Sequence, residues 1–351
     1  MPSDDGPGSI RCSMKLRRSA MERPRVFVTR LIPERGLEML REHCEVEVWP
    51  DELPPSKEAL KEKVRDCEGL LTMLSDPIDA EVIAAAPKLK VISQYAVGVD
   101  NIDIAEATRR GIPVGHTPGV LTEATADLAF ALLMAAARRV VEGADYVRAG
   151  KWKTWGPTLL LGADVWGATL GIVGFGRIGQ AVARRGVGFR MRVLAYDPRP
   201  DEEAAASIGV ELLDLEALLR ESDFVSLHTP LTEETYHMIG ERELKLMKPT
   251  AILINTARGP VVDPKALYRA LKEGWIARAA LDVTEPEPIP TDHPLLGLQN
   301  CLIVPHIGSA SGSTRTEMAV ITAENLLAGL RGQRLPHCAN PQVYERGRPS
   351  E

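Results

Sequence analysis

The stretch TLGIVGFGRIGQAVARR, residues 169–185, decides the fold of this chain. An apolar run typical of a strand enters the glycine turn GFGRIG, and a run typical of a helix leaves it. Gly174 permits the tight turn, Gly176 lets the backbone approach a pyrophosphate, and Gly179 lets the helix pack against the strand. Free N–H groups and the positive dipole at the helix start favour phosphate there. The stretch therefore predicts a dinucleotide-binding turn.

The next strand-like run, MRVLAYD, ends at Asp197, which follows Gly179 by 18 residues (197 − 179 = 18). An acid about 20 residues after such a turn binds the adenosine ribose hydroxyls. Because its carboxylate also repels a 2′-phosphate, NAD(H) is favoured as the cofactor. Arg199 could pair with that phosphate, so NADP(H) stays open. The competing interpretation is a structural turn followed by a surface Asp. It requires the strand, the glycines, the helix and the acid to be in register by chance.

Two blocks of alternating strand-like and helix-like segments organise the chain. The first begins at Arg25, and the second begins at Thr169 and holds six strand-like runs. Continuous apolar runs between amphipathic helices predict parallel sheets covered on both faces. The predicted class is α/β with two doubly wound parallel-sheet domains. They are a Rossmann NAD(P)-binding domain, 121–306, and a second domain, 23–120 plus 307–340, between a disordered leader, 1–22, and a tail, 341–351.

The bulk composition excludes several classes of protein. The 351 residues are 44% hydrophobic and 26% charged, which is ordinary for a globular protein with more than one core. A net charge of −6 gives no electrostatic footprint for nucleic acid or an anionic membrane. The apolar stretch LAFALLMAAARRVV is too short to span a bilayer. Five scattered cysteines form no metal-like cluster, so we expect no metal site and a reducing, cytoplasmic location. The initiating methionine is left open among Met1, Met14 and Met21.

Polar residues directly follow strand-like runs of the second block. Arg258 follows AILINTA, His306 follows NCLIVP, and Asp282, Glu285 and Glu287 follow ARAAL. Ligands of open α/β sheets bind at the carboxyl ends of the strands, so we expect an Arg, a carboxylate and a His to converge there. Spacing alone does not separate Glu285 from Glu287.

Such a trio suits the reduction of a 2-oxo acid to a 2-hydroxy acid. A guanidinium clamps a carboxylate through two parallel hydrogen bonds. A histidine donates a proton to a carbonyl oxygen, and a neighbouring carboxylate stabilises its protonated form. A nicotinamide supplies the hydride. A lone His is more often structural, and we interpret His43, His116, His237, His293 and His337 in that way.

The motifs NTARGPVVDPKAL, AALDVTEPEP and VPHIGSAS closely resemble the signatures of the D-isomer-specific 2-hydroxyacid dehydrogenases. The resemblance covers nearly the whole chain after Arg25. It implies that Arg258 binds the substrate, that His306 donates the proton, and that Glu287 is its acid partner. It also implies a homodimer, a flavodoxin-like substrate domain formed by 23–120 and 307–340, and a substrate pocket lined by LLTMLSD and YAVGVDN. The pocket includes Leu74, Ser75, Val97, Gly98 and, from the neighbouring subunit, Trp155, with Trp152 in reserve.

The cofactor is expected to lie along the glycine turn and the neighbouring strand ends. His228 would line this cleft through HTPLT without acid–base work. The predicted cofactor residues are Thr122, Gly174, Gly176, Arg177, Ile178, Gly179, Asp197, Arg199, His228, Thr229, Pro230, Thr235, Thr256, Ala257, Asp282 and Gly308.

The segments DVTEPEPIPTDHPLL, PHIGSAS and ENLLAGLRG carry a closer match to family members that reduce glyoxylate to glycolate and hydroxypyruvate to D-glycerate. The resemblance implies that activity here. Similar reductases often have a basic or small polar residue in place of Asp197 and use NADPH, so YDPRP favours NADH. The alternatives are another dehydrogenase of the family, such as a phosphoglycerate dehydrogenase, and an NAD-sensing corepressor on the same fold.

Overall fold

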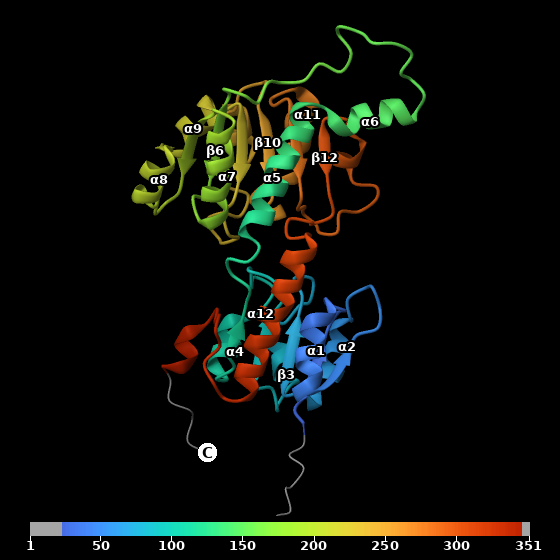
Figure 1. Ribbon diagram of the computed structural model, residues 1–351, viewed down its shortest axis with the longest axis vertical. Helices are drawn as coiled ribbons and strands as arrows, with labels where there is room; N and C mark the ends of the chain where they lie inside the picture. Colours follow the sequence, from blue (N-terminus) through green and yellow to red (C-terminus); the bar gives the residue numbers. More distant parts are fainter. Residues whose placement is uncertain (1–22, 346–351) are drawn as a thin grey trace, which may run out of the picture.

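Two parts, each with one sheet between layers of helices, make up the molecule (Figure 1). The computed structural model describes residues 23–345, so the predicted leader, 1–22, and the final stretch of the predicted tail, 346–351, lie outside it. All strand pairs in both sheets are parallel. The predicted α/β class with two doubly wound parallel sheets is confirmed.

The first sheet has five strands in the order β2-β1-β3-β4-β5, the order of flavodoxin-like sheets. Its strands are β1 (Arg25–Val28), β2 (Glu45–Val48), β3 (Gly69–Thr72), β4 (Val91–Gln94) and β5 (Val114–Gly115). One apolar cluster joins the sheet to α1 (Glu34–His43) and α12 (Gly312–Leu330). A second cluster joins it to α2 (Lys57–Lys63), α3 (Ala80–Ala84) and α4 (Ile104–Arg109).

The second sheet has seven strands in the order β12-β11-β10-β9-β6-β7-β8, which is the Rossmann order with one further strand. They are β6 (Thr169–Val173), β7 (Arg192–Tyr196), β8 (Glu211–Leu212), β9 (Phe224–Leu227), β10 (Ile252–Asn255), β11 (Arg278–Leu281) and β12 (Cys301–Ile303). One apolar cluster joins it to α5 (Thr122–Ala137), α7 (Arg177–Gly188) and α8 (Glu202–Ile208). The other joins it to α9 (Leu215–Glu221), α10 (Glu241–Leu246) and α11 (Pro264–Glu273).

The long helical stretch after residue 121 forms two helices in series, α5 and α6 (Val140–Arg148). The break falls at Arg139, whose φ of +54° is incompatible with a continuous helix. Half of α5 is buried, whereas every residue of α6 is at least partly exposed. Residues 149–161 then project from the seven-stranded part (Figure 1). The chain returns to it at Ala163, whose N–H donates to the Ala137 carbonyl at 2.9 Å, and at Val165, which is buried. Within 23–345, none of the helices combines the length and the apolar character that a membrane span needs.

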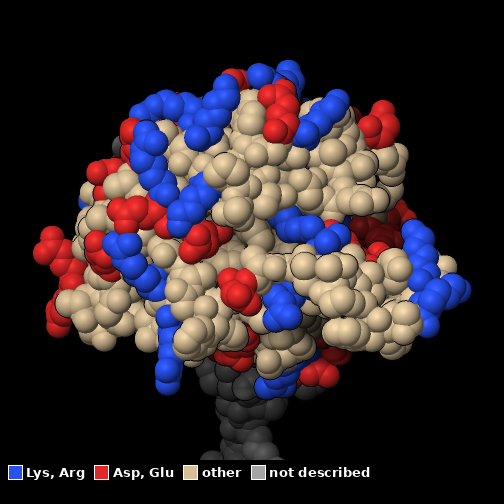
Figure 2. All heavy atoms as spheres, turned by 90° about the horizontal axis from the view of Figure 1, so that it is seen from above, with Lys and Arg blue, Asp and Glu red and all other residues tan. Residues whose placement is uncertain are grey.

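Basic and acidic side chains are interspersed over the outer end of the seven-stranded part. Figure 2 shows Lys and Arg next to Asp and Glu across this face, with uncharged residues between them. Many of these charges are paired at the surface, as in Arg192 with Glu211 and Glu221, and Arg242 with Glu216. Exposed pairs of this kind contribute little to stability.

The last helix, α12, crosses from the second sheet back to the first (Figure 1). It approaches α1 and β4 very closely, because a Cβ at Gly36 would lie 2.8 Å from the Ala319 Cβ and one at Gly329 would lie 2.5 Å from the Val91 Cβ. Glycine is therefore required at both contacts, since no larger side chain fits without a backbone shift.

Residues 341–344, which the sequence places in a loose tail, form a short 3-10 turn. Val343 is buried there, and the Tyr344 hydroxyl accepts a hydrogen bond of 2.9 Å from the Leu335 N–H. The difference has a simple cause: Tyr344 packs against the apolar cluster that includes Leu330 at the end of α12.

The packing of α12 can be tested with two glycines of the same helix. Gly329→Ala should lower the free energy of unfolding by roughly 1–3 kcal/mol, because its methyl group must displace Val91. Gly312→Ala is the matched control, because a Cβ there meets only open space, and it should be neutral or stabilising by up to about 1 kcal/mol. Urea denaturation measures both, and equal effects would contradict the packing described.

Candidate active site

The glycine turn lies between the end of β6 and the start of α7. Gly174 has a φ of +94°, and a Cβ there would lie 2.7 Å from the carbonyl carbon of His228. Only glycine tolerates both conditions. Gly176 caps α7, and a Cβ built on it meets none of the described atoms within 4 Å. The backbone at the helix start therefore faces open space, as a phosphate site requires.

Asp197 ties the end of β7 to this turn. Its Oδ2 accepts a hydrogen bond of 2.9 Å from the Phe175 N–H, and its Oδ1 accepts one of 2.9 Å from the Arg199 N–H. Each carboxylate oxygen has a further lone pair for a hydroxyl donor. The arrangement places a negative charge beside the turn. A carboxylate there can accept hydrogen bonds from the two hydroxyls of a diol and repels a 2′-phosphate.

Buried hydroxyls follow the next two strands. The Oγ1 atoms of Thr229, after β9, and Thr256, after β10, are buried and have no hydrogen-bond partner among residues 23–345. Burying unpaired hydroxyls is unfavourable, so a ligand that supplies partners fits here. His228 comes directly before Thr229, and its Nε2 lies 2.8 Å from Ser226 Oγ. Burial lowers the pKa of His228 to about 3. Its imidazole is therefore neutral at physiological pH.

Three adjacent strands, β10, β11 and β12, are followed by Arg258, Glu287 and His306 in turn. The Nδ1 atom of His306 lies 2.6 Å from Oε1 of Glu287. The two side chains are 30% and 40% exposed, so the free Nε2 of the imidazole is open to a ligand. The contact with Glu287 at Nδ1 fixes the orientation of the ring.

The structure separates the two glutamates that the spacing leaves equivalent. Glu285 Oε2 lies 2.6 Å from Nε2 of His237, and the Tyr236 hydroxyl donates to Glu285 Oε1 at 3.3 Å. The Tyr236 and His237 rings are also stacked. Glu285 thus has its own partners, and of these two glutamates it is Glu287 that contacts the His306 ring. His237, interpreted as structural, has a satisfied hydrogen bond.

Asp282, which the sequence assigns to the cofactor, contacts the backbone directly after His306. Its two oxygens accept the N–H groups of Ile307 at 2.6 Å and Gly308 at 2.8 Å. Burial raises the pKa of this carboxyl, while these two hydrogen bonds act in the opposite direction. His306 itself has a φ of +53°. Asp282 therefore fixes the backbone turn that presents the imidazole.

Arg258 meets the loop that follows β4 of the first sheet. Its Nε and Nη2 donate to Asp100 at 3.1–3.3 Å, and its Nη1 donates to the carbonyl of Ala257 at 2.8 Å. A Cβ on Gly98 would lie 1.7 Å from Nη2, so the guanidinium lies directly on that glycine. Asp100 was missed in the sequence, although it follows a strand in the predicted pocket motif YAVGVDN.

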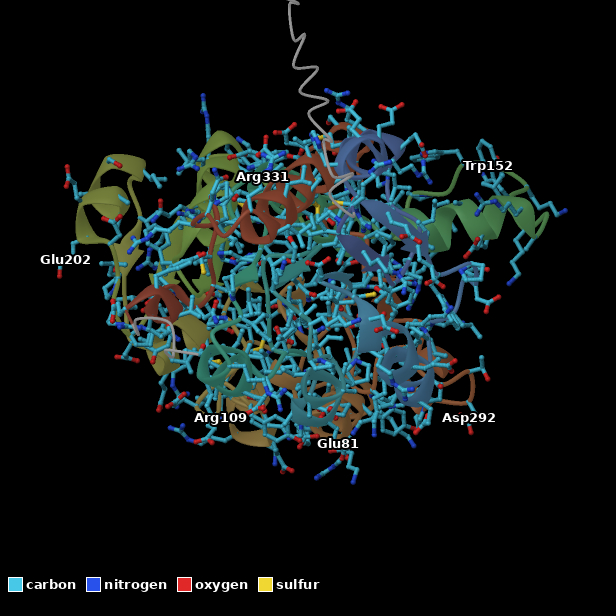
Figure 3. All side chains as sticks on the ribbon, turned by 90° about the horizontal axis from the view of Figure 1, so that it is seen from below. Glu81, Arg109, Trp152, Glu202, Asp292 and Arg331 are labelled. Carbon is cyan, nitrogen blue, oxygen red and sulfur yellow. The ribbon has the colours of Figure 1, made fainter. Side chains whose placement is uncertain are left out.

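The other predicted residues are distributed along the same strand ends and one projecting segment. Leu74 and Ser75 follow β3, and Ser75 Oγ accepts from Arg30 at 3.2 Å. Thr235 Oγ1 donates to the Pro230 carbonyl at 2.7 Å. Figure 3 shows Trp152 at the margin of the molecule, and Trp155, three residues on, is 77% exposed. Thr122 begins α5, Arg177 and Ile178 begin α7, and Val97 adjoins Gly98.

Known proteins resemble this chain along almost its whole length. The family model of the D-isomer specific 2-hydroxyacid dehydrogenase NAD binding domain matches residues 130–308. A glyoxylate reductase of Korarchaeum cryptofilum (strain OPF8) is 64% identical over 324 residues, which cover 92% of this chain and 98% of that protein. A glyoxylate reductase of Pyrococcus furiosus is 54% identical over 331 residues, 93% of this chain and 98% of that protein.

Solved structures agree with these matches. The NADPH-dependent glyoxylate/hydroxypyruvate reductase of Sinorhizobium meliloti, in complex with NADP and malonate, has a TM-score of 0.82 at 31% identity. The match covers 91% of this chain and 98% of that one. The chain therefore belongs to the D-isomer specific 2-hydroxyacid dehydrogenase family. It is an oxidoreductase that uses a nicotinamide dinucleotide, which confirms the predicted family and enzyme class.

The open space at Gly176 allows a test of the cofactor turn. Gly176→Ala should fold normally but weaken NADH binding at least about tenfold, roughly 1.4 kcal/mol, because its methyl group occupies the place where the pyrophosphate meets the backbone. Gly188→Ala, at the other end of α7, is the matched control because its Cβ also meets open space. Fluorescence titration with NADH compares the two, and equal affinities would refute the assignment.

Proposed function

We propose that this protein is an NAD(P)H-dependent reductase that converts glyoxylate to glycolate and hydroxypyruvate to D-glycerate. The observation that carries the proposal is the 2.6 Å contact between His306 and Glu287, next to the strand that presents Arg258. The relatives support the choice of substrate, because the Korarchaeum cryptofilum protein is named a glyoxylate reductase and the Sinorhizobium meliloti protein a glyoxylate/hydroxypyruvate reductase.

The substrate carboxylate binds Arg258 and backbone N–H groups near Val97 and Gly98. The close contact between the Arg258 guanidinium and Gly98 supports this role, because one carboxylate can reach both. The guanidinium provides the planar fork that matches two carboxylate oxygens. Leu74 and Ser75 line the same pocket from the end of β3. The bound 2-oxo acid is thereby oriented with its carbonyl group toward His306.

His306 donates the proton to the carbonyl oxygen from Nε2. Its Nδ1 faces Glu287, so the hydrogen bond at Nδ1 orients the ring and points Nε2 at the substrate. The bound nicotinamide supplies a hydride to the carbonyl carbon. In the reverse direction His306 takes the proton back from the hydroxyl group. Asp282 holds the turn that carries His306 through the N–H groups of Ile307 and Gly308.

We further propose that the cofactor lies along the predicted residues from the glycine turn to Gly308, with NADH preferred to NADPH. The Asp197 carboxylate beside the turn supports that preference, because it accepts ribose hydroxyls and repels a 2′-phosphate. The unpartnered hydroxyls of Thr229 and Thr256 support the site farther along the strands, since they fit a polar ligand.

The proposed domain division assigns 23–120 and 307–340 to the substrate domain and 121–306 to the dinucleotide-binding domain. The packing of α12 on α1 and β4, and of α5 on α7, supports it. Closure of the two domains over the substrate excludes water from the reaction. We also propose that the enzyme works in the cytoplasm. The four cysteines of the described chain are free thiols, which suits a reducing compartment.

The proposed assembly is a homodimer formed through α6 and residues 149–168. This segment exposes apolar side chains that a monomer would leave in water, as a protein interface requires. They include Val140, Val147, Trp152, Trp155, Leu161 and Trp166, each at least 53% exposed. In the dimer, Trp155 of one subunit reaches the active site of the other.

The proton-donor role of His306 can be tested directly. His306→Ala should lower kcat with glyoxylate by roughly 10²–10⁴-fold, because no other group replaces its Nε2–H, while NADH affinity stays unchanged. Turnover is measured as the loss of NADH absorbance during the reaction. His43→Ala, on the outer face of α1, is the control and should match the wild type.

The same assay defines the substrate and the cofactor. NADH and NADPH are compared with glyoxylate, hydroxypyruvate, pyruvate and phosphohydroxypyruvate. Glyoxylate and hydroxypyruvate should give the highest kcat/KM, and NADH should exceed NADPH. Preference for phosphohydroxypyruvate would indicate a phosphoglycerate dehydrogenase, and no turnover with any substrate would favour a corepressor-like binding protein.

The dimer is tested by charge placed on α6. Val147→Asp should convert the wild-type dimer to a monomer, because it puts a carboxylate into an apolar contact. Leu53→Asp, at an even more exposed apolar residue of the first part, should leave the mass unchanged. Light scattering after size exclusion gives the mass, and a monomeric wild type would overturn the proposal.

Trp155→Ala tests the contribution of one subunit to the active site of the other. It should keep the dimer but raise KM for glyoxylate.

A further inference from the structure

Asp100 pairs with Arg258 across the two parts of the molecule. It follows β4 of the five-stranded sheet, whereas Arg258 follows β10 of the seven-stranded sheet. Arg258 Nε lies 3.2 Å from Oδ1 and 3.3 Å from Oδ2 of Asp100, and Nη2 lies 3.1 Å from Oδ1. The three contacts involve one side of the guanidinium, its Nε–Nη2 edge.

The remaining contacts of Arg258 fix the orientation of the fork. Nη1 donates to the Ala257 carbonyl at 2.8 Å. Nη2 lies against Gly98, where a Cβ would be only 1.7 Å away. A guanidinium has five N–H donors in one plane. With the Nε–Nη2 edge held by Asp100, the donors left for a ligand are on the Nη1 and Nη2 side, next to Gly98.

The charge and exposure of the pair fit a positioning contact. The side chains of Arg258 and Asp100 are 23% and 37% exposed, so neither is so deeply buried that ion pairing is needed to fold the chain. Without a partner, the long Arg258 side chain would lose its fixed orientation, since such a side chain has many rotamers. Asp100 therefore orders the Arg258 guanidinium at the point where the two parts meet.

We propose that Asp100 is a positioning residue for the reaction, which aims the Arg258 guanidinium at the carboxylate of the 2-oxo acid. The inference rests on the proposed function, in which Arg258 is the carboxylate clamp. Asp100 does not touch the substrate; it holds the opposite edge of the clamp. It also makes binding depend on the approach of the loop after β4 to the loop after β10. The chain thereby links carboxylate recognition to the contact between its two parts.

The first experiment is steady-state kinetics with glyoxylate at saturating NADH. Asp100→Ala should raise KM about tenfold or more and lower kcat by a smaller factor, with NADH affinity unchanged. Asp100→Asn keeps one acceptor oxygen and should fall between Asp100→Ala and the wild type. Asp103→Asn is the matched control: it removes the same charge three residues away, where Asp103 only accepts the Glu106 N–H, and it should stay within twofold of the wild-type KM.

A double-mutant cycle separates positioning from a merely structural effect. In the Arg258→Ala background, Asp100 has no guanidinium to aim, and its negative charge only repels the substrate. Adding Asp100→Ala should therefore lower KM there, although the same change raises KM in the wild-type background. A structural defect at Asp100 would raise KM in both backgrounds and would overturn the inference.

The cycle also distinguishes the role of Arg258 as carboxylate clamp from the positioning role of Asp100. If Arg258→Ala leaves KM unchanged, the carboxylate clamp itself is wrong and the proposed function loses its substrate site. If Arg258→Ala raises KM while Asp100→Ala does not, the clamp stands and the positioning role of Asp100 is refuted.

Discussion

The parallel direction of all strand pairs is the constraint on which the site depends. In a parallel sheet, every loop that follows a strand emerges at the same edge. Gly174, Thr229, Thr256, Arg258 and His306 follow four strands of one sheet and therefore share that edge, far apart as they are in the chain. The chain needs no special contact to collect them, because the hydrogen-bond ladder of the backbone does so. Side-chain contacts then only refine their positions.

Electrostatic pairing divides the histidines at this edge by role. His306 faces a carboxylate and remains accessible, which suits a proton donor. His237 faces Glu285 and is stacked on Tyr236, so its ring serves the local structure. His228 is kept neutral by burial, which lowers its pKa to about 3, so it adds no positive charge to this edge. One residue type thus has three different surroundings within one edge.

The fold class could be predicted from the sequence because the period of apolar residues and the glycine turn are local signals. β8 was missed because it has only two residues, Glu211 and Leu212, and no apolar run marks it. The break between α5 and α6 depends on the backbone of Arg139, which no residue type announces. The pairing of Glu287 with His306 came from resemblance, since Glu285 has the same chemistry two residues away. The contact of Asp100 with Arg258 joins residues from two sheets, and no local pattern encodes it.

The return of α12 to the first sheet has a mechanical consequence. The chain crosses between the two parts twice, once between β5 and α5 and once between β12 and α12 (Figure 1). A single connecting segment would let the parts twist or slide freely. Two connecting segments restrict them to rotation about a line through both crossings. The proposed closure of the two parts is therefore a hinge rotation about this line. Such a rotation brings the loop after β4 back to the same place opposite Arg258 each time.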